Sequence, residues 1–287
     1  MQTDIIGHYV SPSGIRLTVC DTSMAAGQAR DIHRLPPVSA QILAKIMTGA
    51  ALLAVDFKNH EGISLKWVTG SALGTIHVDA YDGKYVRGYI DEPEAGLGHR
   101  PGAETEAFLV SQSAQLFVTR YSLLKLPYTS AVNLLPGDIS ACLTEYLNTS
   151  EQTLSAVKLD LKTDENGNIS RCGGFLAQLL PEGNLETFAS LFRDLNEWDV
   201  TEGGARGIEA LLEKGKFEKL GANPILFRCT CSEERIRDSL VSLPETEKEE
   251  LLKEESIETV CHYCGKKYTI PREVLRDWFK TERKPNS

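Results

Sequence analysis

Four cysteines in two short pairs constrain the C-terminal part of this chain more than any other feature. The first pair is Cys229-Thr-Cys231, and the second is Cys261-His-Tyr-Cys264. A tetrahedral zinc ion needs four soft ligands at about 2.3 Å, and two cysteine pairs on separate turns provide them. Gly265 follows the second pair and can take the positive φ that such a turn often requires. We therefore predict that these four cysteines bind one Zn²⁺ per chain.

Four thiolates fill the tetrahedral shell and leave no position for a reacting water, which argues against hydrolytic zinc chemistry. His262 lies inside the second pair, but adjacent residues rarely share one small metal, so it is not counted as a ligand. The sequence contains no phosphate-binding glycine loop and no His-Glu-x-x-His motif. We expect no catalytic residue, no further cofactor and no enzymatic activity.

The segment around these cysteines, residues 227–287, has few large apolar side chains and is expected to contain a long charged helix after Pro244. Such a module can hardly fold on an apolar core alone. Structural zinc can supply on the order of 10–16 kcal/mol, so we expect folding here to depend on the metal. Metal-bound sulfurs are thiolates, the form that oxidants attack. This chemistry allows an oxidant-triggered unfolding switch as well as a purely structural site.

Composition limits the partners and the compartment. The formal net charge is -9, with no concentrated basic patch, so we expect no nucleic-acid partner. The longest apolar stretch, residues 42–57, is interrupted by Lys45 and Asp56 and is too short to cross a bilayer. No basic segment precedes an apolar one at the N-terminus, so we expect no signal peptide and a cytoplasmic protein.

The other three cysteines, Cys20, Cys142 and Cys172, are scattered singly among apolar residues. Structural disulfides are rare in a reducing cytosol. We therefore interpret these cysteines as small core residues.

The first 180 residues are predicted to form an α+β core domain with antiparallel sheets. Alternating residues indicate a hairpin over 5–20, strands between 63 and 129, and strands over 155–163 and 171–180. Helices are expected over 23–33, from Pro37 to about Phe57, and after Asp138 as N-cap.

Residues 181–226 are expected to form a helical linker, and residues 227–287 a small zinc-binding domain. The linker's amphipathic helices are broken at Gly203-Gly204 and at Gly215. Leu191, Phe192, Leu195 and Trp198 form one apolar stripe, and Ile208, Leu211 and Leu212 form another. The pattern alone does not decide whether these helices pack permanently or can detach.

Several motifs together resemble heat shock protein 33, the redox-regulated holdase chaperone family of bacteria. The cysteine motifs are Cys229-Thr-Cys-Ser-Glu-Glu-Arg235 and Val260-Cys-His-Tyr-Cys-Gly265. In the core, the similar segments are Gly137-Asp-Ile-Ser-Ala-Cys-Leu-Thr-Glu-Tyr146, Ser150-Glu-Gln152 and Gly173-Gly-Phe175. The resemblance covers nearly the whole chain.

The resemblance implies a chaperone that is inactive when reduced and zinc-bound. Under oxidative stress, disulfides would join Cys229 with Cys231 and Cys261 with Cys264, and zinc would leave. The C-terminal module and linker would then unfold, and the exposed apolar surface would bind unfolding or oxidatively damaged client proteins without ATP. A homodimer is implied on oxidation.

Two other hypotheses start from the same cysteines. A zinc-ribbon nucleic-acid-binding factor would carry a purely structural zinc, but such modules usually have basic and aromatic surfaces. A dithiol oxidoreductase would use Cys261 and Cys264, but its motif usually opens a helix after a strand. The net charge of -9 and the acidic residues around Cys261 disfavour the first hypothesis. The second cysteine pair, which can sequester the thiols, disfavours the other.

Overall fold

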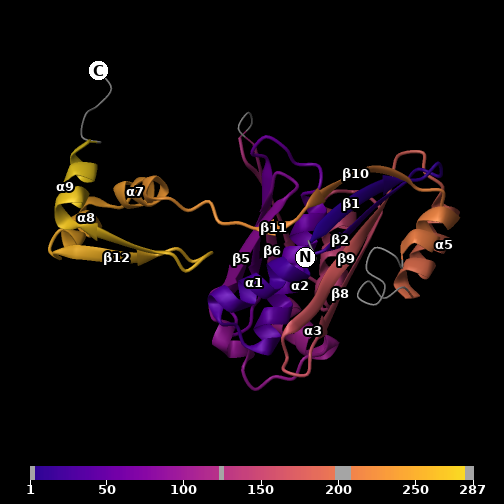
Figure 1. Ribbon diagram of the computed structural model, residues 1–287, viewed down its shortest axis with the longest axis horizontal. Coiled ribbons are helices and arrows are strands. Elements are labelled where there is room, and N and C mark those ends of the chain that lie inside the picture. Colours follow the sequence, from indigo (N-terminus) through magenta and orange to yellow (C-terminus); the bar gives the residue numbers. More distant parts are fainter. Residues whose placement is uncertain (1–3, 123–125, 198–207, 282–287) are drawn as a thin grey trace. The chain divides into compact units, whose positions relative to one another are not determined.

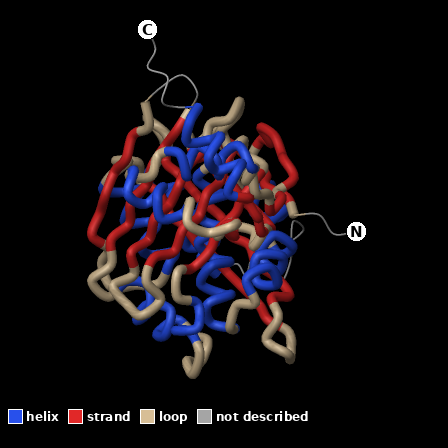
Figure 2. Tube along the Cα trace, turned by 90° about the vertical axis from the view of Figure 1, so that its left-hand side faces the viewer, coloured by secondary structure: helices blue, strands red, loops and turns tan. Residues whose placement is uncertain are grey.

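The computed structural model describes residues 4–122, 126–197 and 208–281, and it contains two compact units (Figure 1). The first unit comprises residues 1–228 and the second residues 229–287. Helices and strands are interspersed along the chain (Figure 2), which confirms the predicted α+β class. None of the described helices combines the length and apolar character that a membrane span needs. The division of the first unit into a core (1–180) and a linker (181–226) stays a prediction.

The first sheet of the first unit is antiparallel and has the strand order β10-β1-β2-β9-β8. Its strands are β1 (Ile5–Val10), β2 (Ile15–Asp21), β8 (Ser155–Thr163), β9 (Ile169–Leu179) and β10 (Glu218–Pro224). The hairpin predicted over 5–20 is confirmed as β1 and β2. The two strands predicted after residue 155 are confirmed as β8 and β9.

The second sheet has the order β11-β5-β4-β3-β6-β7 and is antiparallel except for the β11–β5 pair. Its strands are β3 (Gly62–Val68), β4 (Thr75–Tyr81), β5 (Tyr85–Ile90), β6 (Gln115–Tyr121), β7 (Tyr128–Asn133) and β11 (Leu226–Phe227). The turn between β4 and β5 has positive φ at both Asp82 (56°) and Gly83 (60°). This is the backbone of a tight hairpin turn, and it explains the Asp-Gly pair there.

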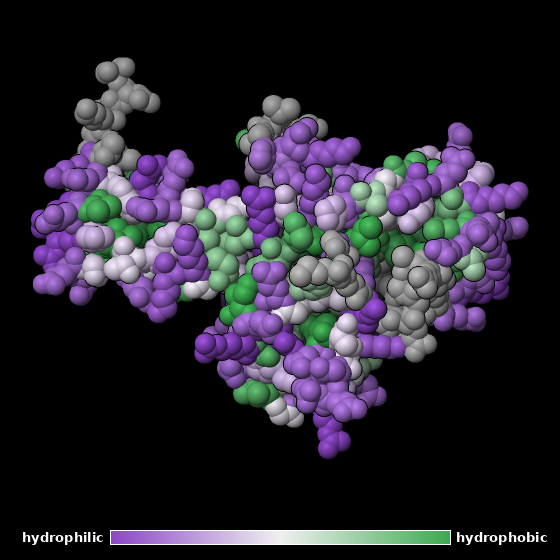
Figure 3. Space-filling model, viewed as in Figure 1, coloured by the Kyte–Doolittle hydropathy of each residue, from purple (hydrophilic) through white to green (hydrophobic). Residues whose placement is uncertain are grey.

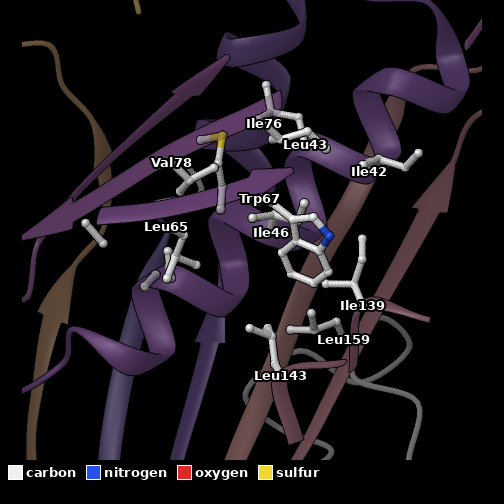
Figure 4. Packing of buried hydrophobic residues seen from close by; sticks show 14 of the residues in the cluster. Ile42, Leu43, Ile46, Leu65, Trp67, Ile76, Val78, Ile139, Leu143 and Leu159 are labelled. Atoms are coloured by element: carbon white, nitrogen blue, oxygen red, sulfur yellow. The ribbon is translucent and has the colours of Figure 1, made fainter. Parts of the chain in front are cut away.

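Helices of the first unit lie between and beside these sheets. They are α1 (Ser23–His33), α2 (Pro37–Leu53), α3 (Ala103–Ser111), α4 (Ile139–Thr149) and a 3-10 turn at Pro93–Gly96. Helix α2 contacts strands of both sheets, and Trp67 and Leu143 are among the residues that pack beside it (Figures 1 and 4). It ends at Leu53, earlier than predicted, because Ala54 closes it with a tightened last turn. Asp138 caps α4 as predicted, accepting the Ala141 N–H at 2.8 Å.

The segment expected to be a helical linker is partly helical and packs on the first sheet. Helix α5 (Leu185–Glu197) and a helix over residues 208–214 bury apolar side chains against β2 and β9. Of the first predicted stripe, Leu191 and Leu195 are buried, whereas Phe192 is exposed. Trp198 and the predicted break at Gly203-Gly204 lie outside the described residues. The predicted helical character of residues 181–226 is wrong for residues 218–224: they form β10, because their backbone pairs with β1.

The second unit is small and has a small core. It contains α7 (Glu233–Val241), α8 (Glu245–Leu251), α9 (Arg272–Thr281) and a hairpin of β12 (Ser256–Val260) and β13 (Lys267–Pro271). The prediction of one long charged helix after Pro244 is wrong, because the chain leaves α8 at Leu252 and soon enters β12. The buried side chains here are Val241, Ile270, Leu275 and Phe279. Hydrophilic side chains dominate its visible face (Figure 3).

Candidate metal centre

The first cysteine pair lies in the short extended segment between β11 and α7. Just before it, Arg228 is held on the first unit: its amide donates to the Val86 carbonyl at 3.1 Å, and its carbonyl accepts from the Tyr81 hydroxyl at 3.0 Å. Just after it, Ser232 caps α7 by accepting the Arg235 N–H at 3.2 Å. The Ser232 cap therefore fixes the chain just after Cys231 at the start of α7.

The second pair lies in the turn that joins β12 to β13. The Cys261 amide donates to the Lys266 carbonyl at 2.9 Å, and the Gly265 amide donates to the Cys261 carbonyl at 2.8 Å. Gly265 has φ of +69°, as predicted, which an L side chain would adopt only with strain. This turn places Cys261 and Cys264 on one side, facing the first pair.

The four sulfurs converge. All four Sγ atoms lie within 4.8 Å of one another. Two distances between the motifs are short: 3.6 Å from Cys229 to Cys261, and 3.4 Å from Cys231 to Cys264. In a tetrahedron with metal–sulfur bonds of about 2.3 Å, sulfurs are about 3.8 Å apart. The four cysteines could therefore hold a metal ion, and this cluster does not include His262.

Tyr268 on β13 is a neighbour of the site that sequence reasoning missed. Its hydroxyl donates to the Cys231 sulfur at 3.2 Å. Partial burial opposes ionisation of Cys231, but hydrogen bonds from Tyr268 and the neighbouring thiols outweigh it and lower the pKa of Cys231 to about 7. Burial raises the pKa of Cys264 to about 12 and also raises that of Cys261. Nothing in the local sequence marks Tyr268, because a tertiary contact between β13 and the distant first pair brings it beside Cys231.

The remaining cysteines lie apart from this cluster. Cys20, Cys142 and Cys172 are each buried in the first unit, which agrees with the interpretation as core residues. Burial raises the pKa of Cys142 to about 12 and that of Cys172 to about 11, and it raises the pKa of Cys20 strongly. Thiols that stay protonated are poor nucleophiles, so these three are chemically quiet.

Comparison with known proteins decides the family. The family model described as Hsp33 protein matches residues 4–271. The chain belongs to the Hsp33 family. A "33 kDa chaperonin" of Desulforamulus reducens is 30% identical over 96% of this chain and 97% of the relative. Another of that name, from Thermus thermophilus, is 31% identical over 95% of this chain and 85% of the relative.

A solved structure supports the fold. The crystal structure of the 33 kDa chaperonin from Thermotoga maritima matches with a TM-score of 0.83 and 23% identity, and it covers 98% of this chain and 99% of that one. At this identity the match shows the shared fold. Membership of the Hsp33 family supports a chaperone function, and it favours that hypothesis over the zinc-ribbon and oxidoreductase hypotheses.

Proposed function

We propose that this chain is an ATP-independent holdase chaperone of the cytoplasm that oxidation switches on. The observation that carries the proposal is the convergence of four cysteine sulfurs in a unit with a small apolar core. The functional parts are a core domain (1–180), a linker (181–226) and a redox-switch domain (227–287). The protein performs no catalysis in this scheme: it binds unfolding or oxidatively damaged client proteins and keeps them from aggregating.

In the reduced state, Cys229, Cys231, Cys261 and Cys264 hold one Zn²⁺. Zinc keeps the sulfurs ionised and joins the two cysteine loops, which supplies folding free energy that the core of this unit lacks. The Tyr268 hydroxyl, at 3.2 Å from Cys231, donates to one thiolate and orients it. The four-sulfur set also matches the softness that zinc prefers.

Oxidation ends this arrangement. Each disulfide would form from two thiolates, whose two electrons, with two protons from solvent, reduce one hydrogen peroxide to two waters, and a bound Zn²⁺ would pass to solvent as its ligands are lost. The proposed pairs are Cys229 with Cys231 and Cys261 with Cys264. In the folded unit the short sulfur distances instead join the two motifs, at 3.6 and 3.4 Å. Pairing within each motif therefore requires the loops to rearrange, and it leaves them without a covalent or metal link.

The linker supplies the surface that clients bind. Phe188, Leu191 and Leu195 of α5 are buried against the first sheet together with Ile15, Leu17 and Phe175. If unfolding of the switch domain releases α5, apolar surface on both the helix and the sheet becomes exposed, as a holdase requires. Exposed apolar surface also favours the homodimer that we propose for the oxidised protein.

Suppression of thermal aggregation tests the proposal. The reduced, zinc-loaded protein is compared with the same sample after warm peroxide treatment, while zinc release is followed. We expect protection of the client only after oxidation, and reversal by reductant with zinc. A Cys20→Ser/Cys172→Ser double variant is the matched control and should switch normally. If the reduced and the oxidised sample suppressed aggregation equally and zinc stayed bound, the zinc site would be purely structural.

A further inference from the structure

Strand β7 forms an edge of the second sheet that differs from the other sheet edges of this protein. It has six residues, Tyr128–Asn133, none of them charged and none a proline. It pairs with β6 on one side and ends the strand order on the other. An exposed edge strand offers unpaired backbone groups to another extended chain.

The register identifies which backbone groups of β7 point outward. The Leu134 amide donates to the Ala114 carbonyl directly opposite, at 2.9 Å. In an antiparallel pair, alternate residues direct both backbone groups to the partner or away from it. Ser130 and Val132 therefore bond to β6, whereas Thr129, Ala131 and Asn133 direct their N–H and C=O groups outward.

Side chains agree with this assignment. Positions without mutual backbone bonds bring opposite side chains closest. Thr119 and Thr129 place their hydroxyl oxygens 2.8 Å apart, and Gln115 donates to Asn133 at 2.8 Å. The three outward residues, Thr129, Ala131 and Asn133, are all exposed, and in the part of the chain that the structure describes no hydrogen bond reaches their outward backbone groups.

The corresponding edge of the first sheet, β8, is covered. Its outward amides at Ser155, Val157 and Leu159 donate to side chains of α4, at 2.8, 3.0 and 3.1 Å. The acceptors are one helical turn apart on a single face of α4: Asn148, Thr144 and Ser140. Side chains of α4 thus accept hydrogen bonds from these three outward amides of β8, and the donors are not available to another strand.

The other edges are protected by sequence or by length. Strand β10 begins with Glu218-Lys219 and ends at Pro224, and charges and proline discourage strand addition. Strand β11 has only two residues. In the second unit, β12 and β13 carry charges such as Glu258 and Lys267. Only β7, among the described strands, lacks all of these protections.

We propose that the outer edge of β7 binds an extended stretch of an unfolded client by strand addition. The choice of an unfolded client as the partner of this edge rests on the chaperone function proposed above. Backbone pairing does not depend on side-chain sequence, which suits a partner of varied sequence, and an uncharged edge repels neither acidic nor basic segments. Exposed Leu126 and Leu135, beyond the two ends of β7, add apolar contacts. A second copy is the competing occupant, and the concentration dependence measured below separates it from a client.

A proline at one outward position of β7 tests whether the client binds this edge, and it leaves the hydrogen bonds between β6 and β7 in place. Ala131→Pro removes an outward N–H and keeps the β6 ladder, since proline is tolerated on the solvent side of edge strands. Ala131→Val keeps the N–H and is the matched control. The probe is labelled α-lactalbumin, reduced and carbamidomethylated so that it stays unfolded, with anisotropy read on the oxidised protein. We expect Ala131→Pro to weaken binding about five- to tenfold and Ala131→Val less than about twofold.

Amide hydrogen exchange on the wild-type protein gives a second readout that needs no variant. Saturating α-lactalbumin should slow exchange at Thr129, Ala131 and Asn133, and leave Ser130 and Val132 unchanged because they already bond to β6. Equal affinity of the two variants with no protection of the outward amides would overturn the edge proposal alone. No binding by the oxidised wild type would overturn the chaperone proposal and the edge with it. Protection that grows with protein concentration in the absence of client would make a second copy the occupant.

Discussion

The two compact units are stabilised by different means. In the first unit, helix α2 is buried between two sheets, and Leu43, Ile46 and Trp67 are completely inaccessible to solvent. In the second unit, the apolar core consists of a few side chains around Leu275, and none of the four cysteines belongs to it. Under the proposed function, a core of the first kind would stay folded in the presence of oxidants. A unit of the second kind would lose its main source of stability once its sulfurs were oxidised.

This difference is what the proposed switch requires, a stable part and a part that can unfold. Local unfolding favours regions with few buried apolar contacts. The first unit keeps its cysteines buried, whereas the second keeps them half-buried and grouped. In the proposed switch, sensitivity to oxidants follows from where the thiols lie as much as from how many there are.

Removal of the metal should produce the largest difference in stability between the two units. A strong zinc chelator under reducing conditions should unfold residues 229–287 and leave the first unit folded, because zinc contributes on the order of 10 kcal/mol there. Cys264→Ser, which removes one ligand, should behave similarly without chelator. Limited proteolysis with mass spectrometry reads both units at once. If the second unit resisted protease without metal, it would not depend on zinc for folding, and the two units would not differ in this respect.

Truncation of core side chains should have the next largest effect, and it should act on one unit at a time. Leu43→Ala and Leu275→Ala each remove a fully buried side chain and should cost about 2–5 kcal/mol of unfolding free energy. Leu43→Ala should leave zinc affinity unchanged, whereas Leu275→Ala should lower it, because folding and metal binding are linked in the second unit. Competition with a chromogenic chelator measures the affinity. Equal zinc affinities in the two variants would contradict the proposed linkage.

Loss of the Tyr268 hydroxyl should have a smaller effect. Tyr268→Phe removes the hydrogen bond to Cys231 and should weaken zinc binding about tenfold, the lower end for groups that orient metal ligands. Tyr128→Phe is the control, since it removes an exposed tyrosine hydroxyl from the first unit, away from the four cysteines. Unchanged affinity in Tyr268→Phe would mean that the hydroxyl does not orient the ligand.

The smallest expected effect is a pH dependence confined to the first unit. Asp4 accepts the N–H groups of Met24 and Ala25 at 2.8 and 2.7 Å, at the start of α1. Burial outweighs these bonds and raises the pKa of Asp4 to about 6. The folded state then holds this proton more tightly than the unfolded state, so its contribution to stability is present below about pH 4 and is lost as pH rises to about 6.

NMR titration of the Asp4 carboxyl tests this directly, and Asp4→Asn should flatten that part of the pH dependence. A pKa at or below 4 would show that the helix N–H groups outweigh burial.

Much of the first unit could be predicted because its signals are local. Alternation of apolar residues indicated the strands, and Asp138 marked a helix start. The four cysteines could be grouped from their spacing alone. Strand β10 was missed because its sequence is polar and rich in small residues, and only the exposed edge of β1 makes it a strand. The contact between Tyr268 and Cys231 joins residues 37 positions apart through tertiary packing, which the local sequence does not display.

Hydrogen exchange of the full chain, measured before and after warm peroxide treatment, tests the central claim most directly. We predict that after oxidation the amides of residues 229–281 exchange rapidly and those of α5 lose protection, while those of α2 and β3 stay protected. Reductant with zinc should restore the original pattern. If oxidation forms both disulfides and the second unit stays protected, the four cysteines do not control its folding and the proposed switch is wrong.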